Sequence, residues 1–136
     1  MQWEGTLPAG RVVRQPVISL DVYATASTAA QAPVPGKRQL DGVDLIPFLL
    51  GEKTIRPHER LYWRLHQKAA LRLGDWKLVR NRRGRAVAPW ELYDLSSDIS
   101  ETNNLASREP DRLEQLKDAW QELDDQMIEP IFIPRR

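Results

Sequence analysis

The chain has 136 residues, a formal net charge of +1 at pH 7, ten prolines and no cysteine. A chain of this length can form one domain with an irregular leader. The lack of cysteine excludes a disulfide framework and a thiolate metal site. No apolar run reaches the roughly 20 residues of a membrane-spanning helix, and the first residues do not resemble a signal peptide. The sequence therefore predicts a soluble chain without a targeting segment.

Charge is distributed unevenly along the chain. The segment from Lys53 to Trp90 contains eleven Lys and Arg but only two Asp and Glu. The segment from Glu91 to Glu129 contains three Lys and Arg and twelve Asp and Glu. Segments of opposite charge attract each other, so the pattern favours a folded unit in which the two segments pack together. A polyanionic partner for the basic segment is the other explanation.

The first half of the chain predicts a leader of loops and two helices. Glycine and proline are too closely spaced in residues 1–16 for a regular element. Residues 19–31 predict a helix that has Ser19 as its N-cap and ends before Pro33.

A second, short helix is expected at about residues 44–50. Asp44 can cap its first turn, and Gly51 can close it. The segment is apolar for its size, so we expect it to dock on a surface that this chain does not supply. Exposed Phe48, Leu49 and Leu50 would also favour self-association through the leader.

The organising feature of the second half is a hairpin centred on Gly74-Asp75. Residues 68–73 and 76–80 alternate like strands, and a glycine at the first of two loop residues accepts the positive φ of a tight turn. Two further antiparallel strands are expected at about residues 60–66 and 90–95.

The hairpin fixes which side chains share a face of the sheet. One face is expected to be apolar, because Leu73 then lies opposite Trp76 and Leu71 opposite Leu78. The other face is half polar and contains the pairs Arg72 with Lys77 and Ala70 with Val79.

A C-terminal helix at about residues 110–127 is expected to cover the apolar face. Pro110 suits its first position and Pro130 stops it. One stripe of apolar side chains recurs every three or four residues. The fold class is therefore α+β, a small four-stranded antiparallel sheet packed against an amphipathic helix. The stripe comprises Leu113, Leu116, Trp120, Leu123 and Met127.

Several segments, in this order, resemble the C-terminal part of the type I sulfatases, arylsulfatase-like members of the alkaline-phosphatase superfamily. The resemblance covers about residues 2–127 and implies the same sheet and helix. It also implies a boundary between residues 1–52, the end of the family's larger domain, and residues 53–136, its C-terminal subdomain. The segments are Trp3-Glu-Gly-Thr-Leu-Pro-Ala-Gly10, Val17-Ile-Ser-Leu-Asp-Val-Tyr-Ala-Thr25, Leu40-Asp-Gly-Val-Asp-Leu-Ile-Pro47, Leu71-Arg-Leu-Gly-Asp-Trp-Lys-Leu78, Glu91-Leu-Tyr-Asp-Leu95, and Asp98, Glu101 and Asn104-Leu-Ala106.

The family resemblance implies chemistry that this chain does not contain. Type I sulfatases use a formylglycine, matured from Cys or Ser in a C/S-x-P-S-R motif, and a calcium ion held by Asp and Asn. This sequence has no cysteine and no serine in such a motif. No catalytic or metal-binding residue can therefore be transferred to it, and calcium and formylglycine are implied only for a full-length parent.

The resulting hypothesis is the C-terminal region of a sulfatase, a sulfuric ester hydrolase. By itself the chain is expected to be inactive, a scaffold that helps to shape the substrate pocket. Its expected partners are the N-terminal sulfatase domain and a sulfated saccharide substrate, and the parent is expected to be periplasmic or secreted.

Three residues near the end of the first strand are candidates for the edge of that pocket: Arg64, His66 and Lys68. A basic cluster there could bind a sulfated sugar through charge-assisted hydrogen bonds. The simpler interpretation is a solvated strand end.

Two other groups have a functional and a structural interpretation. The basic segment 80–85, flanked by Trp76 and Trp90, could make the chain a free-standing module that binds sulfated glycan or nucleic acid, although the near-zero net charge disfavours nucleic acid. An acidic group could bind calcium, but it lacks the EF-hand spacing, and its residue types are common in turns. A fragment without any role is the remaining alternative. The acidic group comprises Asp94, Asp98, Glu101, Asn103 and Asn104.

Overall fold

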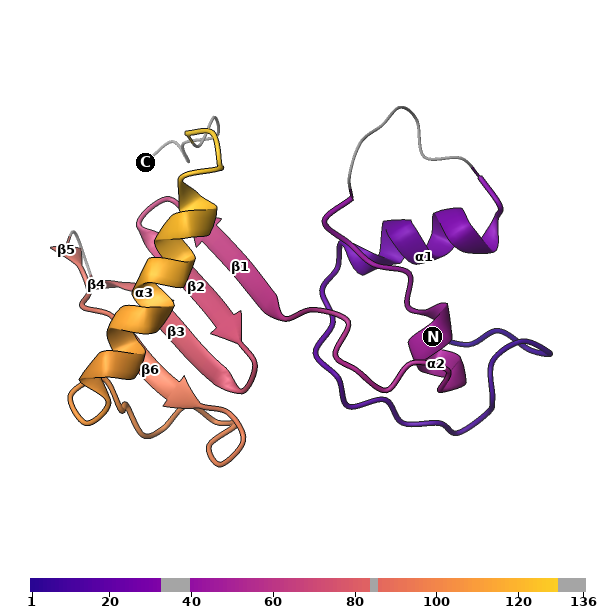
Figure 1. Ribbon diagram of the computed structural model, residues 1–136, viewed down its shortest axis with the longest axis horizontal. Helices are drawn as coiled ribbons and strands as arrows, with labels where there is room; N and C mark the ends of the chain where they lie inside the picture. Colours follow the sequence, from indigo (N-terminus) through magenta and orange to yellow (C-terminus); the bar gives the residue numbers. More distant parts are fainter. Residues whose placement is uncertain (33–39, 84–85, 130–136) are drawn as a thin grey trace. The chain divides into compact units, whose positions relative to one another are not determined.

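The chain forms two compact units, Met1–Glu59 and Arg60–Arg136, in a computed structural model that describes residues 1–32, 40–83 and 86–129 (Figure 1). The predicted boundary between residues 52 and 53 concerns the domains of a longer parent, and it stays a prediction. None of the helices in the described ranges is long and apolar enough to span a membrane.

The first unit contains both predicted helices in shortened form, α1 (Asp21–Ala29) and α2 (Ile46–Leu50). Ser19 does not cap α1. The helix begins two residues later, and the Asp21 carboxylate accepts a hydrogen bond from the Ile18 amide at 2.9 Å. The N-cap of α2 is Leu45 and not Asp44, although Asp44 Oδ1 accepts a hydrogen bond from the Ile46 amide at 3.0 Å. The predicted closure by Gly51 is confirmed, at a φ of 84°.

Polar contacts of α1 hold the first unit together. The Asp21 side chain is fully buried, and its Oδ1 accepts hydrogen bonds from the Val43 amide at 2.9 Å and from His58 Nε2 at 2.8 Å. Thr25, also buried, accepts from the Leu45 amide at 3.0 Å. A buried carboxylate is tolerated only when it is fully hydrogen-bonded. Asp21 is therefore the junction between α1, residues 43–45 and His58.

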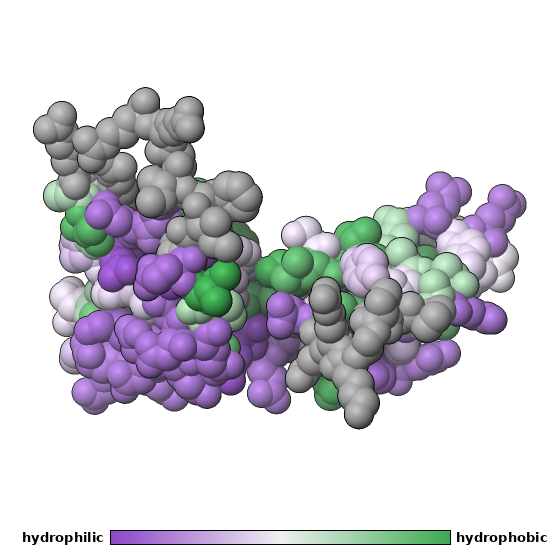
Figure 2. Space-filling model, turned by 90° about the horizontal axis from the view of Figure 1, so that it is seen from above, coloured by the Kyte–Doolittle hydropathy of each residue, from purple (hydrophilic) through white to green (hydrophobic). Residues whose placement is uncertain are grey.

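The outward face of α1 is apolar, the reverse of an ordinary surface helix. Val22 is 60% and Tyr23 53% exposed, while Asp21 and Thr25 point inward. Figure 2 shows green and pale residues over this helix. Phe48 is buried, so the expectation that it is exposed is wrong. Self-association through the leader stays a prediction, for which the outward face of α1 is a better candidate than α2.

The second unit contains a four-stranded antiparallel sheet in the order β1-β2-β3-β6. The predicted hairpin is confirmed, because Gly74 lies in the turn at a φ of 63° and Leu71 pairs with Leu78. β1 stops one residue before the predicted end because His66, at a φ of 56°, begins the turn to β2. The strands are β1 (Arg60–Leu65), β2 (Lys68–Leu73), β3 (Trp76–Arg80) and β6 (Glu91–Asp94).

The connection between β3 and β6 contains a second, two-stranded sheet that the sequence did not predict. β4 (Arg82–Arg83) pairs with β5 (Ala86–Val87). Residues 84–85, the rest of the predicted basic loop, lie outside the described residues. Strands of two residues leave no readable alternation, so pattern reasoning treated this segment as a loop.

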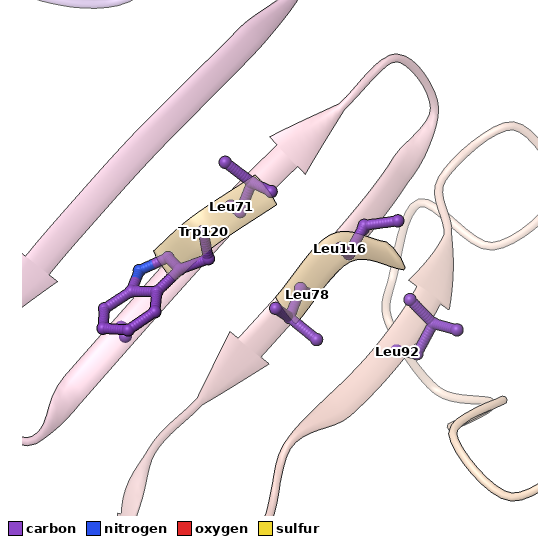
Figure 3. Packing of buried hydrophobic residues seen from close by; sticks show 6 residues of the cluster. Leu71, Leu78, Leu92, Leu116 and Trp120 are labelled. Atoms are coloured by element: carbon purple, nitrogen blue, oxygen red, sulfur yellow. The ribbon is translucent and has the colours of Figure 1, made fainter. Parts of the chain in front are cut away.

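The helix α3 (Pro110–Asp124) covers one face of the four-stranded sheet (Figure 1). Figure 3 shows Leu116 and Trp120 of this helix over three strand leucines. Burying a leucine completely contributes about 1.5–3 kcal/mol, so this layer is the main stabilising element of the unit. The fully buried leucines are Leu71, Leu78, Leu92 and Leu116.

Most of the predicted helix stripe faces this core. Leu116 and Trp120 are buried, and Leu113 and Leu123 pack against them. Met127 is the exception. It is 45% exposed because α3 ends at Asp124, three residues before the predicted end. The observed architecture is the predicted α+β class.

Candidate functional site

The face of β1 that points toward α3 is used to hold the helix. Arg60 pairs with Glu122 at 2.7 Å, and Arg64 pairs with Asp124 at 2.9 Å. The Tyr62 hydroxyl donates a hydrogen bond to the same Asp124 carboxylate. These contacts join the basic segment of the sequence to its acidic segment. Arg64, whose side chain is only 14% exposed, is therefore a structural residue in this arrangement.

Tyr62 gives this contact a pH dependence. Burial, and then the hydrogen bond to Asp124, raise the pKa of the Tyr62 phenol above its ordinary value of 10. A phenol with a higher pKa in the folded state stabilises the fold fully below its unfolded pKa and loses that contribution as the pH rises above it. We expect the second unit to lose stability above pH 10, and Tyr62→Phe to lose less over the same range. Urea midpoints between pH 8 and 11 measure this.

Part of the stability loss above pH 10 should remain in Tyr62→Phe, because burial and a hydrogen bond to Glu91 also raise the pKa of the Tyr93 phenol. Tyr23→Phe is the matched control, since Tyr23 is 53% exposed and belongs to the first unit. An unchanged alkaline slope in Tyr62→Phe would contradict the assignment.

The three predicted pocket residues do not lie together. Arg64 is opposite Ala69 on the face toward α3, whereas Lys68 lies on the other face of the sheet. His66 occupies the turn between them, and its Nε2 is buried without a hydrogen-bond partner among the described residues. A role for the three at the edge of a substrate pocket stays a prediction, but they cannot form one cluster.

The face of the sheet opposite α3, here called the outer face, has an exposed tryptophan that the sequence analysis did not single out. Trp63 is 41% exposed and lies opposite Ala70, followed in the same row by Val79. Alternation along β1 was the available signal, because it places Trp63 on the side away from Tyr62. The outer face also contains Lys68, Arg72 and Lys77, and Lys77 pairs with Glu101.

The basic segment 80–85 is partly committed to the fold. The guanidinium carbon of Arg80 lies 4.4 Å from the ring centre of Trp90 and 5.3 Å from that of Trp120. These are cation–π distances, which stabilise the end of β3. Arg80, Trp90 and Trp120 therefore serve the core, and a free-standing binding module that uses the basic segment 80–85 stays a prediction.

The acidic group after β6 forms turns. Asp94 accepts hydrogen bonds from the Ser96 amide and hydroxyl, and Asp98 accepts from the amides of Thr102 and Asn103. These donors lower the pKa of both carboxyl groups. Asn104 Oδ1 accepts from the Leu92 amide on the edge of the sheet.

The chemistry of a type I sulfatase does not fit the residues present. Within the described ranges, no group of three or more His, Cys, Asp or Glu side chains could hold a metal ion. The whole sequence lacks cysteine and has no C/S-x-P-S-R motif. The part of the chain that the structure describes thus shows no such ligand group, and the sequence contains no formylglycine precursor motif.

Comparison with known proteins gives a consistent result, although no family model matches the chain. Arylsulfatase D of Homo sapiens is 40% identical over 134 residues, covering 76% of this chain and 22% of that protein. An uncharacterized sulfatase of Schizosaccharomyces pombe is 30% identical over 112 residues, covering 76% and 20%.

A solved structure gives the same picture for the fold. Ps i-CgsB, in complex with k-i-k-neocarrahexaose, matches 87% of this chain and 27% of its own, with 27% identity and a TM-score of 0.64. The chain spans about a fifth of the length of the two curated relatives.

Proposed function

This chain belongs to the sulfatase family, as the C-terminal part of such a protein, and from this we propose that it is the non-catalytic end of a sulfuric ester hydrolase. The main support for this proposal is the 40% identity to arylsulfatase D, in a chain that folds as the expected sheet and helix. In this proposal the chain is inactive alone and acts as a scaffold that helps to shape the substrate pocket.

The chemistry of the proposed enzyme belongs to the larger part of the protein. A formylglycine would supply the nucleophile, and a calcium ion would stabilise the charge on the transferred sulfate. The sequence has no C/S-x-P-S-R motif from which a formylglycine could form, which supports a division in which another region performs the reaction. Sulfate esters are the proposed substrates, and a periplasmic or secreted parent is the proposed location.

The outward face of α1 supports a large protein partner. Val22 and Tyr23 on this helix, and Val17 and Leu20 just before it, are all about half exposed or more. Contiguous exposed apolar side chains are typical of interaction surfaces. We assign this face to contact with the N-terminal sulfatase domain. The chain matches only 22% of arylsulfatase D, so most of such a protein lies in other regions.

Activity measurements test the proposal. The purified 136-residue chain should hydrolyse 4-methylumbelliferyl sulfate no faster than buffer. A polypeptide obtained by extending the same reading frame upstream should contain a C/S-x-P-S-R motif and hydrolyse the ester. Its activity should disappear when the Cys or Ser of that motif is replaced with alanine.

Two results would overturn the proposal. The first is sulfate release by the 136-residue chain itself. The second is an extended reading frame that contains no such motif and gives no activity when it is co-expressed with a formylglycine-generating enzyme.

A further inference from the structure

We propose that the outer face of the sheet binds a sulfated saccharide, with Trp63 as the stacking platform and Lys68 and Arg72 as the cationic groups. The proposal rests on the proposed function, because membership of the sulfatase family favours a sulfated saccharide over other anions. It adds a binding surface that the chain supplies with its own residues.

The register of β1 and β2 creates the platform. Trp63 lies directly opposite Ala70, and Val79 follows in the same row on β3. Small neighbours cannot cover an indole, and Trp63 remains 41% exposed. A large aromatic side chain left in water on a sheet face has an unused apolar surface. The apolar face of a pyranose ring is complementary to it.

The cationic groups flank this platform. Lys68 and Arg72 lie two residues to either side of Ala70 on β2, so both are diagonal neighbours of Trp63, about 7–8 Å away. Lys68 is exposed. Arg72 Nε donates a hydrogen bond to the Gly74 carbonyl at 2.9 Å, whereas its Nη2 lies 3.8 Å from Asp75, a loose ion pair with which a sulfate would compete.

Spacing and charge together favour a sulfated sugar as the occupant. Lys68 and Arg72 are four positions apart on one strand, which is about 13 Å at 3.3 Å per residue. An oligosaccharide with sulfate groups on different rings could place one sulfate near each cation and a ring on the indole between them. Charge-assisted hydrogen bonds to sulfate oxygens would then add to the stacking. A purely apolar partner would leave Lys68 and Arg72 desolvated, which costs free energy.

Calorimetric titration of the 136-residue chain with k-i-k-neocarrahexaose tests the site. Trp63→Ala should weaken binding at least tenfold, and Trp63→Phe should restore part of the loss. Trp3→Ala is the matched control, because Trp3 is 42% exposed in the first unit and should bind like the unsubstituted chain. Lys68→Gln should flatten the dependence of affinity on salt, because one sulfate contact is lost.

Other outcomes identify other occupants and overturn the proposal. Equal binding of the desulfated hexasaccharide would remove the role of the cations. Tighter binding of a single-stranded oligonucleotide would indicate a nucleic-acid surface. A dimer that forms without saccharide binding and dissociates in Trp63→Ala would make the face an interface between copies. Circular dichroism of each variant shows that the fold is retained.

The binding and catalytic proposals fail separately. The titration measures binding and not turnover. If the chain does not bind the saccharide, activity of the extended polypeptide would still be evidence for a sulfatase. Conversely, the chain could bind the saccharide while its extended reading frame lacks the sulfatase motif. That result would support the binding surface and contradict the proposed enzyme.

Discussion

Replacing Asp21 with alanine is expected to unfold the first unit while the second unit stays folded. The substitution removes the acceptor of the Ile18 and Val43 amides and of His58 Nε2. A fully buried donor left without a partner costs about 1–3 kcal/mol; these three donors are part-buried, and few buried apolar side chains compensate for their combined loss. Among residues 1–32 and 40–59, the buried apolar residues are Ala24, Leu45 and Phe48.

Hydrogen exchange measured by mass spectrometry resolves the two units. Peptides from residues 1–59 should lose protection in Asp21→Ala, and peptides from residues 60–129 should keep it. Asp41→Ala is the matched control, since Asp41 is an exposed carboxylate in the same unit. Protection in residues 1–59 that is unchanged by Asp21→Ala would show that the carboxylate is not the junction of this unit.

The second large effect is expected from Leu78→Ala at the centre of the sheet. Leu78 is fully buried between Leu71 and Leu92 and beneath Leu116 (Figure 3). Truncation of a buried leucine costs about 2.7–5 kcal/mol, because the lost transfer energy is joined by the cost of a cavity. A unit of this size has a total stability of only about 5 kcal/mol. The variant should therefore be largely unfolded at 25 °C.

Urea unfolding followed by tryptophan fluorescence measures the loss. Leu65→Ala provides the control, because Leu65 is also a strand leucine of this unit but is 63% exposed. Its midpoint should stay close to that of the unsubstituted chain. Similar losses in the two variants would mean that the layer between the sheet and α3 does not carry the stability of this unit.

The arrangement of the sheet could be read from local patterns. The Gly74-Asp75 link sets the pairing of β2 with β3, and strict alternation then assigns each side chain to one face. The spacing of Leu116 and Trp120 in the same way identifies the covered face of α3. These predictions succeed because a two-residue turn and a helical period leave little freedom in register.

Only part of the candidate site could be predicted from the sequence. Alternation already implied that Arg64 and Lys68, four residues apart across a turn, need not share a face. It also implied that Trp63 lies away from the core. What the pattern could not supply was the degree of exposure of Trp63, which depends on the small size of Ala70 and Val79 across the sheet.

The sequence by itself determined the α+β class, the hairpin register, the covered face of the helix and the absence of a C/S-x-P-S-R motif. Only the tertiary structure decided the partners of the charged side chains. Arg64 is committed to Asp124, and Asp21 to Val43 and His58, across 60, 22 and 37 positions. The physical reason is that local periodicity fixes the direction of a side chain, whereas its partner depends on where distant elements end and cross.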